Sequence, residues 1–106
     1  MTVSPLEVSS RLDAGEPLRL IDVREPDEFK KARIAGAELI PMGTIPGALE
    51  KLLGTPGSII VFCHHGMRSL NVVQWLRQRG VANCSSMEGG IDQWSREVDA
   101  SVPRYR

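Results

Sequence analysis

The most informative part of the sequence is Ser58-Ile59-Ile60-Val61-Phe62-Cys63-His64-His65-Gly66-Met67-Arg68-Ser69. Its first part, residues 58–62, is almost entirely apolar and lacks the polar alternation of a half-exposed strand. This composition predicts a strand buried on both faces, as in a parallel sheet. Residues 69–79 have the apolar spacing of an amphipathic helix, which Gly80 ends. The segment is therefore predicted to be a strand, a short loop and a helix.

Strand and helix patterns alternate on both sides of this segment. The first helix is the best marked, because Ser4, Pro5 and Glu7 form an N-cap, a first helical residue and a capping box. The expected strands are residues 18–22, 38–40, 58–62 and 84–87, and the expected helices begin near residues 5, 26, 48, 69 and 91. In the second helix, Phe29 and Ala32 are expected to face inward. This order predicts an α/β domain with a central, mostly parallel sheet of about four to five strands and helices on both faces.

Length and composition limit the function classes. The 106 residues suit one domain over residues 1–106. Lys plus Arg and Asp plus Glu number 13 each, so bulk charge favours neither a nucleic-acid nor a membrane partner. The apolar run 59–63 is too short to cross a bilayer, and no signal-peptide pattern is present. Two cysteines form no disulfide framework, so we expect a cytoplasmic protein with reduced thiols.

Cys63 lies where the predicted fold places functional sites. In open α/β sheets, ligands bind at the carboxyl ends of the strands. A tight loop that enters a helix turns several backbone N–H groups toward one point, and the helix dipole adds positive potential there. Arg68 adds a full charge, and Gly66 allows the sharp bend. We therefore predict that Cys63 is an exposed, reactive thiolate; the alternative is a buried cysteine with Arg68 as a solvated charge.

The other cysteine and the two histidines allow several interpretations. A Cys-His-His run could suggest zinc, but structural zinc needs about four convergent ligands and only Cys84 remains, so no metal is expected. His64 and His65 are expected to line the mouth of the site and tune its charge near neutral pH, or to be simple exposed loop residues. Cys84 is predicted to be a core residue, with a resolving thiol for Cys63 as the alternative.

Four ordered motifs resemble the rhodanese superfamily. They are Ile21–Phe29, Ile34–Ala37, the six-residue loop Cys63–Arg68 and Glu88–Trp94. The chain departs from the family pattern at Ala32-Arg33, where glycine-histidine is usual. The closing segment 95–105 is similar to bacterial rhodanese domains fused to ubiquitin-like activating enzymes. This second likeness implies sulfur supply for cofactor or tRNA pathways.

The resemblance implies a sulfurtransferase whose catalytic residue is Cys63. Sulfur would move from a donor such as thiosulfate to cyanide, a thiol or a protein through a Cys63 persulfide, without a cofactor. The implied substrate-binding residues are His64, His65, Gly66, Met67, Arg68 and Ser69, with Arg68 on the anionic end of the donor. Asp22 and Arg24 end the first long strand, so we expect them to approach the loop and to orient it by hydrogen bonds or ion pairing, with a direct chemical role as the alternative. Implied partners are the small donor and acceptor, and a desulfurase or sulfur-carrier protein.

Three other functions fit parts of the same pattern. Cysteine-based phosphatases and arsenate reductases share this fold, but their loops place arginine six positions after cysteine, where this chain has Ser69. A non-catalytic binding module would usually lack the cysteine. A relay protein that receives persulfide from a desulfurase would use the same chemistry with a protein substrate.

Overall fold

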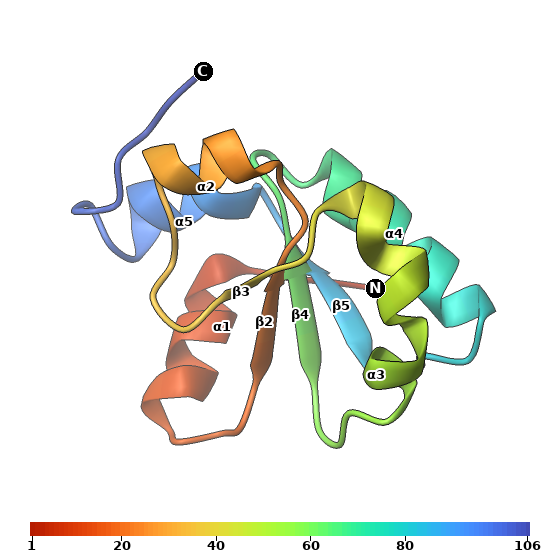
Figure 1. Cartoon of the computed structure of the whole chain (residues 1–106). Coiled ribbons are helices and arrows are strands. Elements are labelled where there is room, and N and C mark those ends of the chain that lie inside the picture. Colours follow the sequence, from red (N-terminus) through yellow and green to blue (C-terminus); the bar gives the residue numbers. More distant parts are fainter.

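Five parallel strands form one sheet in the computed structural model, which describes residues 1–106 (Figure 1). The strands are β1 (Thr2–Val3), β2 (Arg19–Asp22), β3 (Glu38–Leu39), β4 (Ile59–Phe62) and β5 (Cys84–Met87). The helices are α1 (Pro5–Asp13), α2 (Pro26–Lys31), α3 (Leu49–Leu53), α4 (Met67–Gln78) and α5 (Gly90–Glu97), with the 3-10 helix η1 (Met42–Ala48) before α3. None of the helices has the length and apolar content needed to cross a bilayer.

The sheet has the order β1-β5-β4-β2-β3, so β4 is the central strand. Every neighbouring pair is parallel, which confirms the predicted α/β class. The register pairs Asp22 of β2 with Phe62 of β4. The residues that follow these two strands, including Cys63, therefore lie side by side at the carboxyl ends of the strands.

The central strand β4 is buried on both faces, as its composition predicts. Ile59 and Val61 belong to a core cluster with α3 and α4, whereas Ile60 and Phe62 belong to a cluster with α1 and α5. Figure 1 shows these helices as two layers on opposite sides of the sheet. Alternate side chains of β4 thus pack against the helices on both faces of the sheet. This packing positions the loop after β4 between α4 and α5.

The structure differs from the sequence prediction in a few short elements. The two-residue strand β1 is too short to show a periodic pattern, and it forms because it pairs with β5. The helix α4 begins at Met67, two residues before the expected start. Phe29 does not face fully inward as expected: it is partly exposed, and the Arg33 guanidinium lies 4.5 Å from its ring centroid. Ala32 is buried as predicted.

Candidate active site

Two backbone amides converge on the sulfur atom of Cys63. The Gly66 amide donates to Sγ at 3.1 Å, and the Ser69 amide, in the first turn of α4, donates at 3.4 Å. Gly66 precedes α4 with a φ of 107°, a left-handed conformation that glycine adopts without strain. Amide donors and the N-terminus of a helix both stabilise negative charge, so this arrangement suits a sulfur atom that takes part in anionic chemistry.

The first turn of α5 holds the same loop from the other side. The Ile91 amide donates to the Cys63 carbonyl at 2.9 Å, and the Asp92 amide donates to the His64 carbonyl at 3.1 Å. These bonds anchor two carbonyl groups of the loop to the start of α5. Gly90, with a φ of 59°, allows the close approach, because a Cβ atom there would collide with the Cys63 carbonyl oxygen. The amide cradle therefore depends on a contact from a distant segment.

Cys63 is buried, which corrects the expectation of an exposed thiol. Its residue is only 2% exposed, and it belongs to the core cluster on the α4 side of the sheet. The hydroxyl of Ser69 lies 3.5 Å from Sγ and 2.7 Å from the hydroxyl of Ser86, and both serines are also buried. The loop wraps around the sulfur so closely that the groups stabilising its charge also shield it from solvent.

Arg68 is held by a residue outside the loop. Its Nη1 and Nη2 atoms each lie 2.8 Å from a carboxylate oxygen of Glu28, in a bidentate ion pair. The hydrogen bonds from Arg68 lower the pKa of Glu28 to about 2, despite the opposing effect of burial, and the same contact raises the pKa of Arg68. The charge that we expected to face an anionic donor is therefore compensated within the protein.

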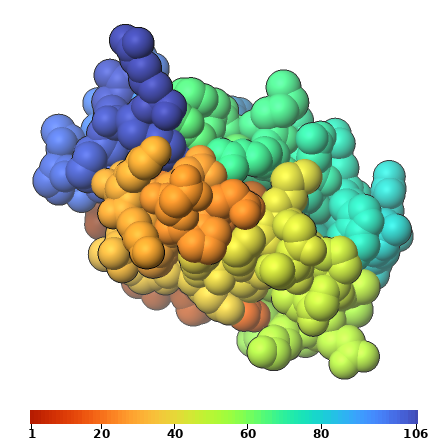
Figure 2. Space-filling view, turned by 45° about the horizontal axis from the view of Figure 1, so that its top comes forward, coloured from red at the N-terminus to blue at the C-terminus, as the bar shows by residue number.

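Tyr105, close to the C-terminus, connects this ion pair to a buried arginine. Its hydroxyl donates to Glu28 Oε1 at 2.9 Å and accepts from Arg24 Nη1 at 2.9 Å. Its ring stacks on His64 with 3.9 Å between centroids and 7° between planes. Burial raises the pKa of Tyr105 to about 12, so the hydroxyl stays protonated. Figure 2 shows the C-terminal tail, in dark blue, lying against the orange α2 region.

Asp22 and Arg24 form a fully buried ion pair, with Arg24 Nη2 2.7 Å from Asp22 Oδ2. Arg24 also donates to the Ala32 carbonyl at 2.7 Å. Burial opposes the charge of Arg24, but its hydrogen bonds to Asp22 and Tyr105 raise its pKa overall. The expected contact with the catalytic loop is absent. The pair instead fixes the end of α2 and the tail, and its connections to the loop run through Tyr105 and Glu28.

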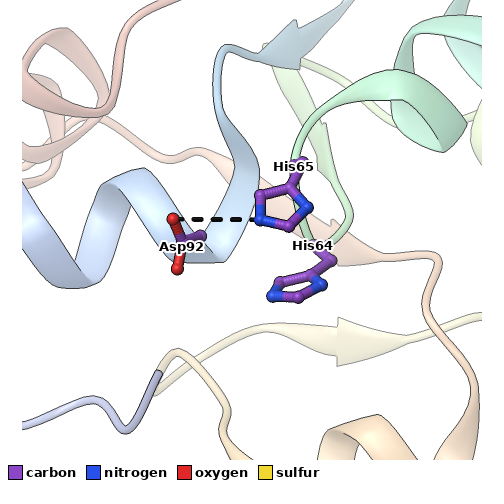
Figure 3. A group of neighbouring side chains, drawn as sticks. All are labelled: His64, His65 and Asp92. Carbon is purple, nitrogen blue, oxygen red and sulfur yellow. Dashed lines mark ion pairs between the residues drawn. The ribbon is translucent and has the colours of Figure 1, made fainter. Parts of the chain in front are cut away.

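The two histidines occupy different environments at the mouth of the loop. His64 lies between Tyr105 and His65, whose ring centroid is 3.8 Å away. Burial, followed by the nearby His65, lowers the pKa of His64, which favours the neutral form of this ring. His65 has a 66% exposed side chain, and its Nε2 lies 3.9 Å from Asp92 Oδ2 (Figure 3).

Cys84 lies far from Cys63 along the sheet. Its register partner on β4 is Ile59, and Cys63 is four residues further on, a rise of about 13 Å along a strand. Cysteines bridge only when their Cα atoms lie within about 7 Å. Burial raises the pKa of Cys84, whose thiol points to the Val81 carbonyl at 3.3 Å. This geometry supports the core role and opposes the resolving role.

A depression of about 350 Å³ opens beside the loop. Its lining includes His65, Gly66, Met67 and Ser86. Met67 is 71% exposed, so this predicted substrate-binding residue presents apolar surface at the rim. A substrate group that enters here would meet the backbone of the loop before it meets the sulfur.

The sequence analysis did not assign a role in the site to three residues: Glu28, Asp92 and Tyr105. Glu28 has a local role, since it accepts from the Glu25 amide in the capping box of α2, and this role accounts for it in the sequence. Tyr105 lies 77 residues from Glu28, and no periodic pattern connects them. One signal in the sequence could have pointed to Tyr105. Arg24 follows the predicted strand 18–22 closely, and an arginine buried at that place needs several hydrogen-bond acceptors.

Comparisons with known proteins show the family and the fold of this chain. The profile of the Rhodanese-like domain family matches residues 4–97. The chain is 36% identical over 96 residues to the putative sulfurtransferase YtwF of Bacillus subtilis, covering 91% of each chain. It is 32% identical to the probable adenylyltransferase/sulfurtransferase MoeZ of Mycobacterium tuberculosis, but spans only 27% of that protein's length. The crystal structure of SSP1007 from Staphylococcus saprophyticus matches with a TM-score of 0.82, at 32% identity, over 97% of this chain and 98% of that one.

Proposed function

Since the chain belongs to the rhodanese-like domain family, we propose that it is a sulfurtransferase in which Cys63 carries the transferred sulfur as a persulfide. The observation that carries this proposal is the convergence of the Gly66 and Ser69 amides on Sγ. These donors stabilise negative charge on a single sulfur atom without a metal or cofactor. The related protein YtwF, which has about the same length as this chain, is itself named a putative sulfurtransferase.

The first half of the reaction loads Cys63. The thiolate attacks the outer sulfur of a donor such as thiosulfate, and a new S–S bond forms at Sγ. The S–S bond of thiosulfate breaks, and sulfite leaves with the electron pair. Because the donor approaches from solvent, the added sulfur lies on the outer side of Sγ, at an S–S bond length of about 2.05 Å. Loading therefore moves the reactive atom outward from a buried position.

The second half returns the enzyme to its starting state. A nucleophilic acceptor, such as cyanide or a thiolate, attacks the outer sulfur and forms a bond to it. The Cys63 thiolate leaves with the electrons of the S–S bond, and the loop amides stabilise its charge again. This covalent route divides one difficult transfer into two easier displacements.

The charge balance of the loop favours donors other than small dianions. Arg68 is the cationic group of the loop, and Glu28 already neutralises it through two hydrogen bonds. A phosphatase needs an arginine free to bind phosphate, and this pairing therefore also disfavours the phosphatase alternative. A persulfide on another protein or on a small thiol carries less charge than thiosulfate, so it suits this loop better.

A relay function is the second candidate, and the alignment with MoeZ favours it. This chain matches one part of a protein named for both adenylyltransferase and sulfurtransferase activity. In a relay, the persulfide on Cys63 would come from a desulfurase and pass to a sulfur-carrier protein. The chemistry at Sγ is identical, and only the substrates differ.

Mass spectrometry of the intact protein tests sulfur transfer directly. The protein is incubated with thiosulfate in one sample and with a desulfurase and cysteine in another. We expect a gain of one sulfur atom, located on Cys63 by peptide mapping and removed by cyanide. Stronger loading by the desulfurase than by thiosulfate would support the relay function.

Two variants serve as controls in this experiment. Cys63→Ser is expected to gain no sulfur, whereas Cys84→Ser is expected to load as the natural protein does. The proposal fails if neither donor loads Cys63, or if Cys63→Ser still carries a transferable sulfur. Loss of loading in a folded Cys84→Ser variant would show that the second thiol takes part.

A further inference from the structure

Three side chains with metal-binding atoms meet beside the catalytic loop (Figure 3). They are His64 and His65, which follow Cys63, and Asp92 in the first turn of α5. One ligand atom from each lies within 4.8 Å of the others. Distant parts of the chain are joined here by the hydrogen bond from the Asp92 amide to the His64 carbonyl, at 3.1 Å. The carboxylate is thus fixed close to both imidazole rings.

The hydrogen bonding of this group leaves ligand atoms unused. His64 Nε2 is buried and has no hydrogen-bond partner. A buried polar atom without a partner is costly, and a bound ion would satisfy it. His65 Nε2 lies 3.9 Å from Asp92 Oδ2, which is too far for a hydrogen bond but close enough for both atoms to bind one ion after small side-chain rotations.

We propose that His64, His65 and Asp92 form a binding site for a divalent transition metal such as Zn²⁺. Two imidazole nitrogens and one carboxylate oxygen are the donor set that three-ligand zinc sites use, with a fourth position left for water. Metal–ligand bonds of about 2.0–2.2 Å require the three atoms to draw together from their present separation. Because the His65 side chain is 66% exposed, it has room to make this movement.

Arg104 competes with the metal for the carboxylate. Its Nε donates to Asp92 Oδ1 at 2.9 Å and its Nη2 donates to Oδ2 at 3.3 Å. The Arg104 side chain is 58% exposed, so a metal ion can displace it at small cost. Since Arg104 precedes Tyr105, metal binding would also loosen the tail that covers His64. The site therefore links metal binding to the C-terminal tail.

Titration with Zn²⁺ against a chromophoric chelator tests this site without any activity measurement. We expect one Zn²⁺ per chain. His65→Ala and Asp92→Asn should each weaken binding by about tenfold or more, since even the loss of an outer-shell partner costs that much. Arg104→Gln should strengthen binding by about threefold, because it removes an exposed competing ion pair. Circular dichroism checks that each variant is folded.

Two further variants decide between this site and other sources of binding. Asp99→Asn is the matched control, because the Asp99 carboxylate bonds only to Ser101 and the substitution should leave the affinity unchanged. Cys63→Ser should also leave it unchanged. The proposal is overturned if no saturable binding occurs, if folded His65→Ala and Asp92→Asn bind as tightly as the natural protein, or if Cys63→Ser abolishes binding, which would make the thiol the ligand.

Discussion

Glu28 binds the guanidinium group of Arg68 with both carboxylate oxygens, each 2.8 Å from a guanidinium nitrogen. One residue lies on α2 and the other in the first turn of α4, so the contact ties two elements together above the sheet. It also cancels the positive charge that the loop would otherwise offer to a substrate. The net charge beside the Cys63 loop therefore depends on Glu28, a residue outside that loop.

Removing the Glu28 charge should improve the use of an anionic donor. Glu28→Gln is expected to lower the KM for thiosulfate by about fivefold, because a freed unit charge gains roughly 1 kcal/mol at 4 Å in water. Arg68→Ala should raise this KM, since it leaves the carboxylate unpaired near the loop. Steady-state kinetics with thiosulfate and cyanide measure both, with Asp27→Asn as the control on the same helix. A change in the same direction for both variants would contradict the charge argument.

The same ion pair should contribute an acid-sensitive part of the stability. The pKa of Glu28 falls from an ordinary value of 4.5 to about 2 in the folded protein. Its contribution is therefore complete above about pH 4.5 and is lost as the pH falls toward 2. Allowing for solvent around the partly exposed Arg68, we expect roughly 1–2 kcal/mol. Urea unfolding across this pH range should show a shallower loss for Glu28→Gln, and an equal loss would contradict the assignment.

The Tyr105 hydroxyl should stabilise the fold separately from the Tyr105 ring. Tyr105→Phe removes the bonds to Glu28 and Arg24 but keeps the ring that stacks on His64. We expect a loss of about 1–2 kcal/mol of unfolding free energy, because a buried donor of Arg24 loses its best partner. Tyr105→Ala should lose more, and Arg106→Ala should lose nothing. Equal stability of the Phe variant and the natural protein would show that the hydroxyl is not needed.

Gly90 should be essential for the shape of the catalytic loop. Gly90→Ala places a Cβ against the Cys63 carbonyl and requires a φ of 59° from a residue that resists it. We expect a loss of at least about 2 kcal/mol of unfolding free energy, together with slower loading of Cys63 by thiosulfate. Gly43→Ala is the control, because its Cβ would meet nothing within 4 Å. Unchanged stability and loading in Gly90→Ala would remove α5 from the support of the site.

The sequence predicted the elements whose patterns are local. The apolar run of β4 and the amphipathic face of α4 are both visible in short windows, and the loop between them follows directly. The first helix was also correct at its N-cap, where the Ser4 hydroxyl accepts from the Glu7 amide at 3.1 Å, although the return bond from the Ser4 amide to the Glu7 side chain, which would complete the predicted capping box, does not form. These features depend on neighbours within one or two helical turns, which is why a single sequence reveals them.

The parts of the site that the sequence did not predict depend on contacts between distant residues. The charge of Arg68 was visible, but its partner Glu28 lies 40 residues away. Cys63 is buried because α5 and the loop pack around its sulfur atom. The spacing of residues in the sequence does not predict this packing. The interpretation of the histidines failed to include Asp92 for the same reason. Sequence patterns singled out Cys63, and tertiary packing determined its surroundings.

The outermost strands of the sheet, β1 and β3, contain two residues each. Strand edges carry unpaired backbone groups that can recruit an edge of another molecule and begin aggregation. A two-residue edge offers too few such groups to seed an intermolecular sheet. Because β1 and β3 are so short, they disfavour aggregation of neighbouring copies of this chain through pairing of their edge strands.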